Sequence, residues 1–425
     1  MPPNDRSSTP RRFEDFLPRD GTEDLLAKTE ALDDFLAAAP QEYLEGLGLQ
    51  SLGPAAARAR FRDRGGREFE GIHLASNSYL SLTTDPEVVE ASRAACAKYG
   101  YGTGAVSLYG GITDLHRALE ERIARLYGTE DAIVFPSGYS ANVGVLSALC
   151  GPGDVTLHDA ANHASIFDGA RLSGADIRVY LHRNTAHLEK LLRRLPPERK
   201  GRLIVTDGVF SMDGDLAPLD RIVELAARYG ARVMVDEAHA LGVVGPTGRG
   251  TPERFGCAGR VDVIAGTLSK TPGAIGGYCA GRRALIQYLR YYARTYFFST
   301  SLPAPVVAGL NVAFDRLLAD TAGRDALWRN IRHLSAGLRR AGFDLGDTES
   351  AILPVRVGDE TKLARFHRAL RERGVFTNLV TYPAVRRKEC RLRVSVMNAL
   401  TTADLDRALA AFEEAGRAGG VLGSA

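Results

Sequence analysis

The sequence predicts an α/β fold: a mostly parallel, seven-stranded sheet covered by helices, followed by a smaller α+β domain at the C-terminal end. Two observations support this prediction. From residue 71 to about residue 305, short apolar runs alternate with helical patterns, as in sheets whose strands are connected through helices. After residue 305, longer helical stretches predominate. The seven apolar runs are residues 132–135, 155–157, 177–180, 203–206, 233–235, 261–265 and 277–280.

The length of 425 residues exceeds the usual size of one domain, and a content of 45% hydrophobic and 25% charged residues is enough to form a full core. We expect a disordered tail over residues 1–20, because its beginning is polar, contains proline and lacks the apolar core of a signal peptide. Residues 21–70 are predicted to form a helical arm, from the apolar spacing between Asp24 and Leu47. Residues 71–305 and 306–425 are the expected large and small domains.

The charge balance limits the class of partner. Lys and Arg outnumber Asp and Glu by only 54 to 51, which is too even for a general nucleic-acid or membrane-surface binder. Pro136 and Asn142 interrupt the one long uncharged stretch, so we expect no integral membrane segment. The five cysteines are scattered without metal-ligand spacing, which predicts free thiols, a cytoplasmic location and no metal site.

Two short segments point to a pyridoxal phosphate (PLP) site. Asp236 follows the buried run 233–235, where a carboxylate can pair with a protonated pyridine nitrogen. Lys270 follows the next buried run in a loop of small residues, as a lysine that forms an imine with the cofactor requires. Each segment alone is common in α/β proteins, and a single lysine after serine is usually a surface residue. Their order and spacing together favour the PLP site.

Further candidates lie where other predicted strands end. Ser137, Gly138 and Tyr139 open a helix after the first strand, where backbone N–H groups can hold a phosphate, although the same residues also suit an ordinary turn and cap. Thr267 could add a hydroxyl to that phosphate. His163 lies in a loop where its ring could stack on the pyridine, but a histidine in a loop is more often structural.

Several motifs resemble those of a known family, the α-oxoamine synthases of the aspartate-aminotransferase fold. The resemblance extends from about residue 74 to residue 415, and the serine palmitoyltransferase and 2-amino-3-ketobutyrate ligase branches are the most similar. It implies a fold-type I PLP-dependent transferase. The motifs are residues 77–82 (NSYLSL), 162–169 (NHASIFDG), 207–214 (DGVFSMDG), 235–242 (VDEAHALG), 266–270 (GTLSK) and 298–303 (FSTSLP).

The resemblance implies a role for each matching residue. Lys270 would attach PLP, Asp236 would pair with its ring nitrogen, and His163 would stack on the ring. The remaining roles concern the phenolic oxygen and the phosphate of the cofactor, and the carboxylate of the substrate. Ser211 and His239 would reach the phenolic oxygen; Ser137, Gly138, Tyr139 and Thr267 would hold the phosphate, together with Ser299 and Thr300 of a second subunit; and Arg393, assisted by Asn77, would bind the carboxylate of the amino acid. A homodimer with shared active sites is therefore expected.

The reaction implied is a decarboxylative, Claisen-type condensation of an amino acid with an acyl thioester, delivered by CoA or by an acyl-carrier protein, to give an α-amino ketone. In this reaction Lys270 would remove the Cα proton, and His163 would donate a hydrogen bond to the thioester carbonyl.

Three departures from the family concern the substrate pocket. Ser107 stands where relatives usually carry arginine, Leu400 replaces a common histidine, and residues 381–386 (TYPAVR) replace an arginine and proline-rich loop. A synthase of secondary metabolism therefore fits as well as one of sphingolipid synthesis. Two alternatives remain: another fold-type I enzyme such as an aminotransferase, and a non-catalytic PLP-binding regulator.

Overall fold

The computed structural model describes residues 13–17, 21, 24–38, 48–199, 201–319 and 321–423. Most of the tail expected to be disordered lies outside these ranges. Within it, Phe13–Phe16 form a 3-10 helix (η1), and the ring of Phe16 lies 5.3 Å from that of Phe35 in helix α1 (Ala27–Ala38). None of the described helices is long and apolar enough to cross a membrane.

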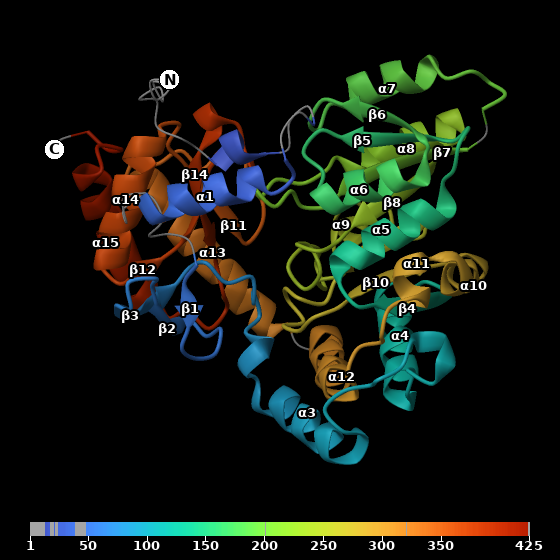
Figure 1. The fold of residues 1–425 in the computed structure, drawn as a ribbon, viewed down its shortest axis with the longest axis horizontal. Helices are drawn as coiled ribbons and strands as arrows, with labels where there is room; N and C mark the ends of the chain where they lie inside the picture. Colours follow the sequence, from blue (N-terminus) through green and yellow to red (C-terminus); the bar gives the residue numbers. More distant parts are fainter. Residues whose placement is uncertain are drawn as a thin grey trace.

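The seven predicted strands form one sheet in the order β4-β10-β9-β8-β7-β5-β6 (Figure 1). Only β10 runs antiparallel to its neighbours, because it follows β9 through a short loop rather than through a crossover helix. The strands are β4 (Asp131–Phe135), β5 (Val155–Asp159), β6 (Asp176–Tyr180), β7 (Arg202–Asp207), β8 (Arg232–Asp236), β9 (Val263–Thr267) and β10 (Gly277–Gly281).

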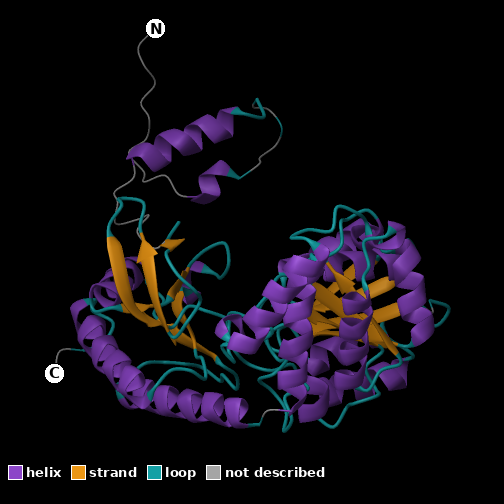
Figure 2. Cartoon of the chain, turned by 90° about the horizontal axis from the view of Figure 1, so that it is seen from below, coloured by secondary structure: helices purple, strands orange, loops and turns teal. Residues whose placement is uncertain are grey.

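Helices cover both faces of this sheet, as Figure 2 shows for the strands enclosed on its right-hand side. Alternate residues of one strand enter opposite cores: Met234 packs on one face, whereas Val233 and Val235 pack on the other. One face carries α5 (Gly138–Leu149), α6 (Ala164–Ser173), α10 (Arg283–Tyr292) and α11 (Arg294–Phe297); the other carries α4 (Asp114–Tyr127), α7 (Thr185–Arg193), α8 (Leu219–Tyr229) and α12 (Ala304–Ala319).

The smaller domain contains two short sheets. One has the antiparallel order β11-β14-β13, from Ile352–Arg356, Arg391–Ser395 and Asn378–Val380. The other has the order β1-β2-β3-β12, from Gln50–Ser51, Arg58–Arg62, Glu68–His73 and Val375–Phe376. Helices α13 (Ala322–Arg340), α14 (Glu360–Glu372) and α15 (Thr402–Ala418) pack against these sheets through one apolar core.

The predicted helical arm is wrong for its second half, because residues 50–73 form strands β1 to β3. Charged and smaller or apolar residues alternate along β2, a two-residue period that suits a strand with one buried face. The partner that completes this sheet is β12, whose Val375 pairs with Ile72 from far along the chain. Within the described part of the arm, only Ala27–Ala38 is an α-helix.

The expected domain boundary at residue 305 also falls too early. Helix α12 packs with α4 in the core of the large domain, where Val307, Leu310 and Phe314 contact the same apolar cluster as Leu119. It also lies along α3 (Pro86–Tyr99) (Figure 1). On the C-terminal side of the large domain, the small-domain core resumes with α13. Short helices complete the chain: η2 (Leu82–Thr84), η3 (Ser107–Tyr109), α9 (Thr251–Arg254) and η4 (Arg387–Glu389).

Candidate active site

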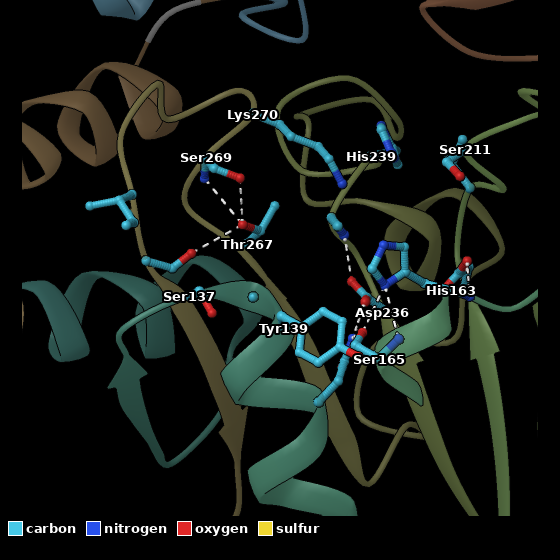
Figure 3. A pocket seen from close by; sticks show the side chains of 17 residues that line it. Ser137, Tyr139, His163, Ser165, Ser211, Asp236, His239, Thr267, Ser269 and Lys270 are labelled. Atoms are coloured by element: carbon cyan, nitrogen blue, oxygen red, sulfur yellow. Dashed lines mark hydrogen bonds between the residues drawn. The ribbon is translucent and has the colours of Figure 1, made fainter. Parts of the chain in front are cut away.

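A cavity of about 300 Å³ lies at the carboxyl ends of β7, β8 and β9, the edge where a parallel sheet binds its ligands. Nine of the residues predicted from the sequence line this cavity: Ser137, Gly138, Tyr139, His163, Ser211, Asp236, His239, Thr267 and Lys270 (Figure 3). The cavity is also lined by residues that we had not predicted as site residues, among them Asn142, Ser165, Asp207, Ser269 and Ile275.

Lys270 follows β9 and points into the cavity (Figure 3). Burial, together with the nearby charge of Arg393, lowers the pKa of its amine to about 8, against the opposing attraction of Asp236 and Asp207. A lysine amine reacts as a nucleophile or base only when it is neutral, so this environment suits covalent attachment of a carbonyl compound.

Asp236 is the last residue of β8 and is 6% exposed. Its carboxylate accepts hydrogen bonds from Asn142 Nδ2 at 2.6 Å and from the backbone N–H of Ala238 at 2.9 Å. These two donors fix the carboxylate at the floor of the cavity, where it can hold a proton on a ring nitrogen.

His163 caps the N-terminus of α6, and its ring lines the cavity. Ring nitrogen Nδ1 lies 2.7 Å from Ser165 Oγ, and the backbone N–H of His163 donates to Asp207 Oδ2 at 3.1 Å. Partial burial lowers the pKa of the His163 imidazole, and burial raises the pKa of the Asp207 carboxyl. A neutral imidazole is therefore available as a hydrogen-bond donor to a substrate oxygen.

The start of α5 forms a cradle for an anion. Ser137 caps this twelve-residue helix by accepting the N–H of Ser140 at 3.0 Å. A Cβ at position 138 would lie 2.7 Å from Thr267 Cβ, so only glycine allows this close approach of helix and β9. Thr267 Oγ1 lies 2.8 Å from Ser269 Oγ. Free backbone N–H groups and clustered hydroxyls are the donors that a phosphate requires.

On the opposite side, a second set of hydrogen bonds reaches the small domain. His239 Nδ1 lies 2.7 Å from the hydroxyl oxygen of Tyr79, and the same oxygen lies 3.3 Å from Asn77 Oδ1. Asn77 Oδ1 accepts two bonds from Arg393 of β14, each of 3.1 Å, and Arg393 Nε donates to the carbonyl of Ser211 at 2.6 Å. The structure thus brings the predicted residues Asn77 and Arg393 together next to the cavity. Tyr79, which we had not predicted, links Asn77 to His239.

Five of the predicted site residues do not line the cavity of the single chain: Asn77 and Arg393, which lie next to it, and Ser107, Ser299 and Thr300. Ser107 is buried in η3, and Thr300 forms an isolated antiparallel bridge with Val106 in the same region. Ser299 precedes this bridge. Exposed aromatic side chains lie near them in the sequence, with Tyr109 73% and Phe298 67% exposed.

The residues present fit PLP. The buried amine of Lys270 and the carboxylate of Asp236 line one cavity, and the anion cradle of α5 lies beside them. A carbonyl group, a protonated ring nitrogen and a phosphate each find a chemical partner in this set.

Comparisons with known proteins agree with this geometry. Residues 70–412 match the model of the family described as aminotransferase class I and II. The 8-amino-7-oxononanoate synthase 1 of Bacillus subtilis is 45% identical, over 81% of this chain and 87% of that protein. The 4-hydroxy-2,2'-bipyrrole-5-methanol synthase PigH of a Serratia species is 44% identical over 87% of this chain, which spans only 56% of PigH.

Among solved structures, the serine palmitoyltransferase of Sphingomonas wittichii superposes with a TM-score of 0.89 and 36% identity, over 94% of this chain and all of that one. A structure of SPT with PLP superposes with a TM-score of 0.87 and 35% identity. Both comparisons confirm the fold-type I architecture predicted from the sequence.

Proposed function

The chain belongs to the aminotransferase class I and II family and, within it, to the PLP-dependent α-oxoamine synthases, and from this premise we propose which residues perform the reaction. Enzymes of this class condense an amino acid with an acyl thioester and release carbon dioxide. The printed name of the Bacillus subtilis relative agrees with such chemistry, because an 8-amino-7-oxo acid carries its amine beside a ketone. The observation that supports the assignment most is the pairing of Lys270 and Asp236 in one cavity.

Bound PLP supplies an electron sink that stabilises negative charge at the Cα atom of the substrate. Lys270 attaches the cofactor and, once released, accepts the Cα proton on Nζ. With a pKa of about 8, a fraction of this amine is neutral near pH 7 and can take the proton. Asp236 keeps a proton on the ring nitrogen through a charge-assisted hydrogen bond.

Three further groups orient the reactants. Arg393, which Asn77 holds in place, binds the carboxylate of the amino acid. His163 would pack against the ring of the cofactor and donate a hydrogen bond to the thioester carbonyl, where negative charge develops. His239 and Ser211 line the cavity and would reach the phenolic oxygen, and the cradle of Ser137, Gly138, Tyr139 and Thr267 would hold the phosphate.

The complete site requires a homodimer in this proposal. Ser299 and Thr300 lie outside the cavity of their own chain and would reach the phosphate of the partner. Exposed Tyr109 and Phe298 supply apolar area for such an interface. Ser107 would act on the acyl-donor side from the same region. The five cysteines are free thiols, which supports a reducing, cytoplasmic location.

The decisive experiment crosses amino acids, labelled with ¹³C at the carboxyl carbon, with acyl-CoA and acyl-carrier thioesters. We expect labelled carbon dioxide, free thiol and an α-amino ketone in equal amounts, detected by mass spectrometry, with no product from Lys270→Ala. An aminotransferase would instead move the amine to an oxo acid without any thioester, and that result would refute the proposal. A serine and palmitoyl-CoA preference would place the chain in sphingolipid synthesis, and another pair would favour secondary metabolism.

A further inference from the structure

Two buried polar residues of the cavity have no part in the reaction described above. Asn142 of α5 is 2% exposed and Ser165 of α6 is fully buried. Figure 3 shows Ser165 close to Asp236 and His163, and hydrogen bonds place Asn142 between Ser165 and Asp236. Asn142 Nδ2 donates to Asp236 Oδ2 at 2.6 Å and to Ser165 Oγ at 2.9 Å. Ser165 Oγ in turn lies 2.7 Å from His163 Nδ1. The four side chains therefore form one continuous chain of hydrogen bonds.

The direction of each bond follows from the carboxylate. Asp236 accepts at both oxygens, so the amide of Asn142 must present its NH₂ group to it. The opposite orientation would set Asn142 Oδ1 against the carboxylate oxygen, with no hydrogen between two acceptors. The orientation present leaves the buried Oδ1 without a partner among the described residues. The same NH₂ group occupies a lone pair of Ser165 Oγ, and the hydroxyl hydrogen is then free for His163.

The donor and the acceptor of the hydrogen bond between Ser165 and His163 are therefore defined. Ser165 presents two donors to Nδ1, its hydroxyl at 2.7 Å and its backbone N–H at 3.3 Å. A ring nitrogen that accepts carries no proton, so the proton of a neutral imidazole resides on Nε2. Within the described part of the chain, Nε2 has no hydrogen-bond partner, and the ring lines the cavity.

We infer that Asn142 and Ser165 are positioning residues that transmit the charge of Asp236 to His163 and hold its imidazole as the Nε2–H tautomer. This inference rests on the proposed function, because the Nε2–H group is the donor offered to the thioester carbonyl. One carboxylate thus serves both the ring nitrogen of the cofactor and the donor on the acyl side. The arrangement places the proton before the thioester arrives, so the donor needs no reorganisation during the reaction.

The tautomer can be observed directly in the PLP-loaded enzyme. Long-range ¹H–¹⁵N spectra of protein labelled at its nine histidines distinguish protonated from unprotonated ring nitrogens, and His163→Gln assigns the signals. We expect His163 to be protonated at Nε2 and not at Nδ1. A proton on Nδ1, or on both nitrogens, at pH 7.5 overturns the inference, and the spectrum that decides it is that of the wild-type enzyme.

Ser165→Ala tests whether the hydroxyl of Ser165 fixes the tautomer of His163. Without the hydroxyl, the signals should move towards a mixture of tautomers, and kcat with the thioester should fall about tenfold, the effect of one lost hydrogen bond. The affinity for the amino acid, measured by spectral titration, should change little, and Ser165→Thr should restore the tautomer. Ser147→Ala is the matched control, because it removes a hydroxyl of α5 that bonds only to Val143 O. An unchanged His163 spectrum in Ser165→Ala refutes the role of Ser165.

These results are separate from the proposed function. If the wild-type enzyme condenses no thioester while His163 shows the Nε2–H tautomer, the function fails and the hydrogen-bond chain stands. If condensation occurs while the tautomer is wrong, the function stands and the chain of bonds fails.

Discussion

The active site has two hydrogen-bonded walls, and different parts of the chain contribute their side chains. The cofactor wall comprises Asp236, Asn142, Ser165 and His163, all from the large sheet and the helices on it. The substrate wall comprises His239, Tyr79, Asn77 and Arg393, and it joins the large domain to strand β14 of the small one. The first wall therefore depends on the large domain alone, whereas the second depends on one apolar core that both domains share.

This difference separates two kinds of failure. A change in the cofactor wall should affect the chemistry while the amino acid still binds, because the small domain is untouched. A change at Asn77 or Arg393 of the substrate wall should weaken binding of the amino acid while the cofactor remains in place. Substitutions in each wall therefore test whether chemistry and amino-acid binding are separable.

The largest effect is expected from Lys270→Ala. Removal of the base should lower turnover by on the order of 10³-fold or more and abolish covalent attachment of the cofactor. Intact-mass measurement after borohydride reduction checks the attachment, with wild type as the positive control. A variant that still carries reducible cofactor at this site would contradict the assignment.

Asp236→Asn tests the carboxylate of the cofactor wall. Loss of a charge-assisted hydrogen bond, about 1.5 to 3 kcal/mol, should slow exchange of the Cα proton by roughly 10- to 100-fold while the cofactor stays bound. Exchange in deuterated water, followed by NMR, measures this rate. Exchange at the wild-type rate would remove Asp236 from the reaction.

Arg393→Ala tests the substrate wall. The dissociation constant of the amino acid should rise by about 10- to 100-fold, because a charge-assisted contact to the carboxylate is lost. Arg393→Lys should rescue poorly, since an ammonium cannot reproduce the planar two-point contact. Spectral titration measures both variants, and Arg329→Ala on the exposed surface of α13 is the control. Unaltered affinity in Arg393→Ala would contradict the division between the walls.

The smallest effect concerns the support of the cofactor wall. His182 Nδ1 bonds Asp159 at 2.9 Å and Nε2 bonds Asp215 at 3.0 Å, so the ring joins the loop of His163 to the loop of Ser211. These carboxylates overcome the opposing effect of burial and raise the pKa of His182 to about 10.

Since this folded-state pKa lies above the unfolded value near 6.5, the stabilisation is complete below pH 6.5 and is lost as the pH rises through about 10. We expect wild type to lose roughly 2 kcal/mol of unfolding free energy between pH 7 and pH 10, after allowance for partial exposure of the ring. His182→Gln should be less stable at pH 7 and show a flatter profile. Urea unfolding at several pH values measures it, and parallel profiles for both proteins would exclude the bridge.

Much of the cofactor wall could be predicted from the sequence because its main residues stand directly after buried strands. Asp236 ends β8 and Lys270 follows β9, and parallel strands bring such ends to one edge. Asn142 and Ser165 could not be selected, since a polar residue near a helix start is usually a cap or a turn. Only the packing of α5 beside α6 reveals that they meet.

The sequence by itself determined the seven strands, the cofactor chemistry and the family, because apolar periodicity and short motifs are local properties of the chain. The tertiary structure decided what depends on distant partners. Strands β1 to β3 were missed because β12 completes their sheet, and α12 was misplaced because the core that buries it is formed by α4. Arg393 reaches Asn77 across 316 residues because β14 and the segment from Leu74 to Tyr79 pack into the same apolar core, and no local pattern encodes that contact.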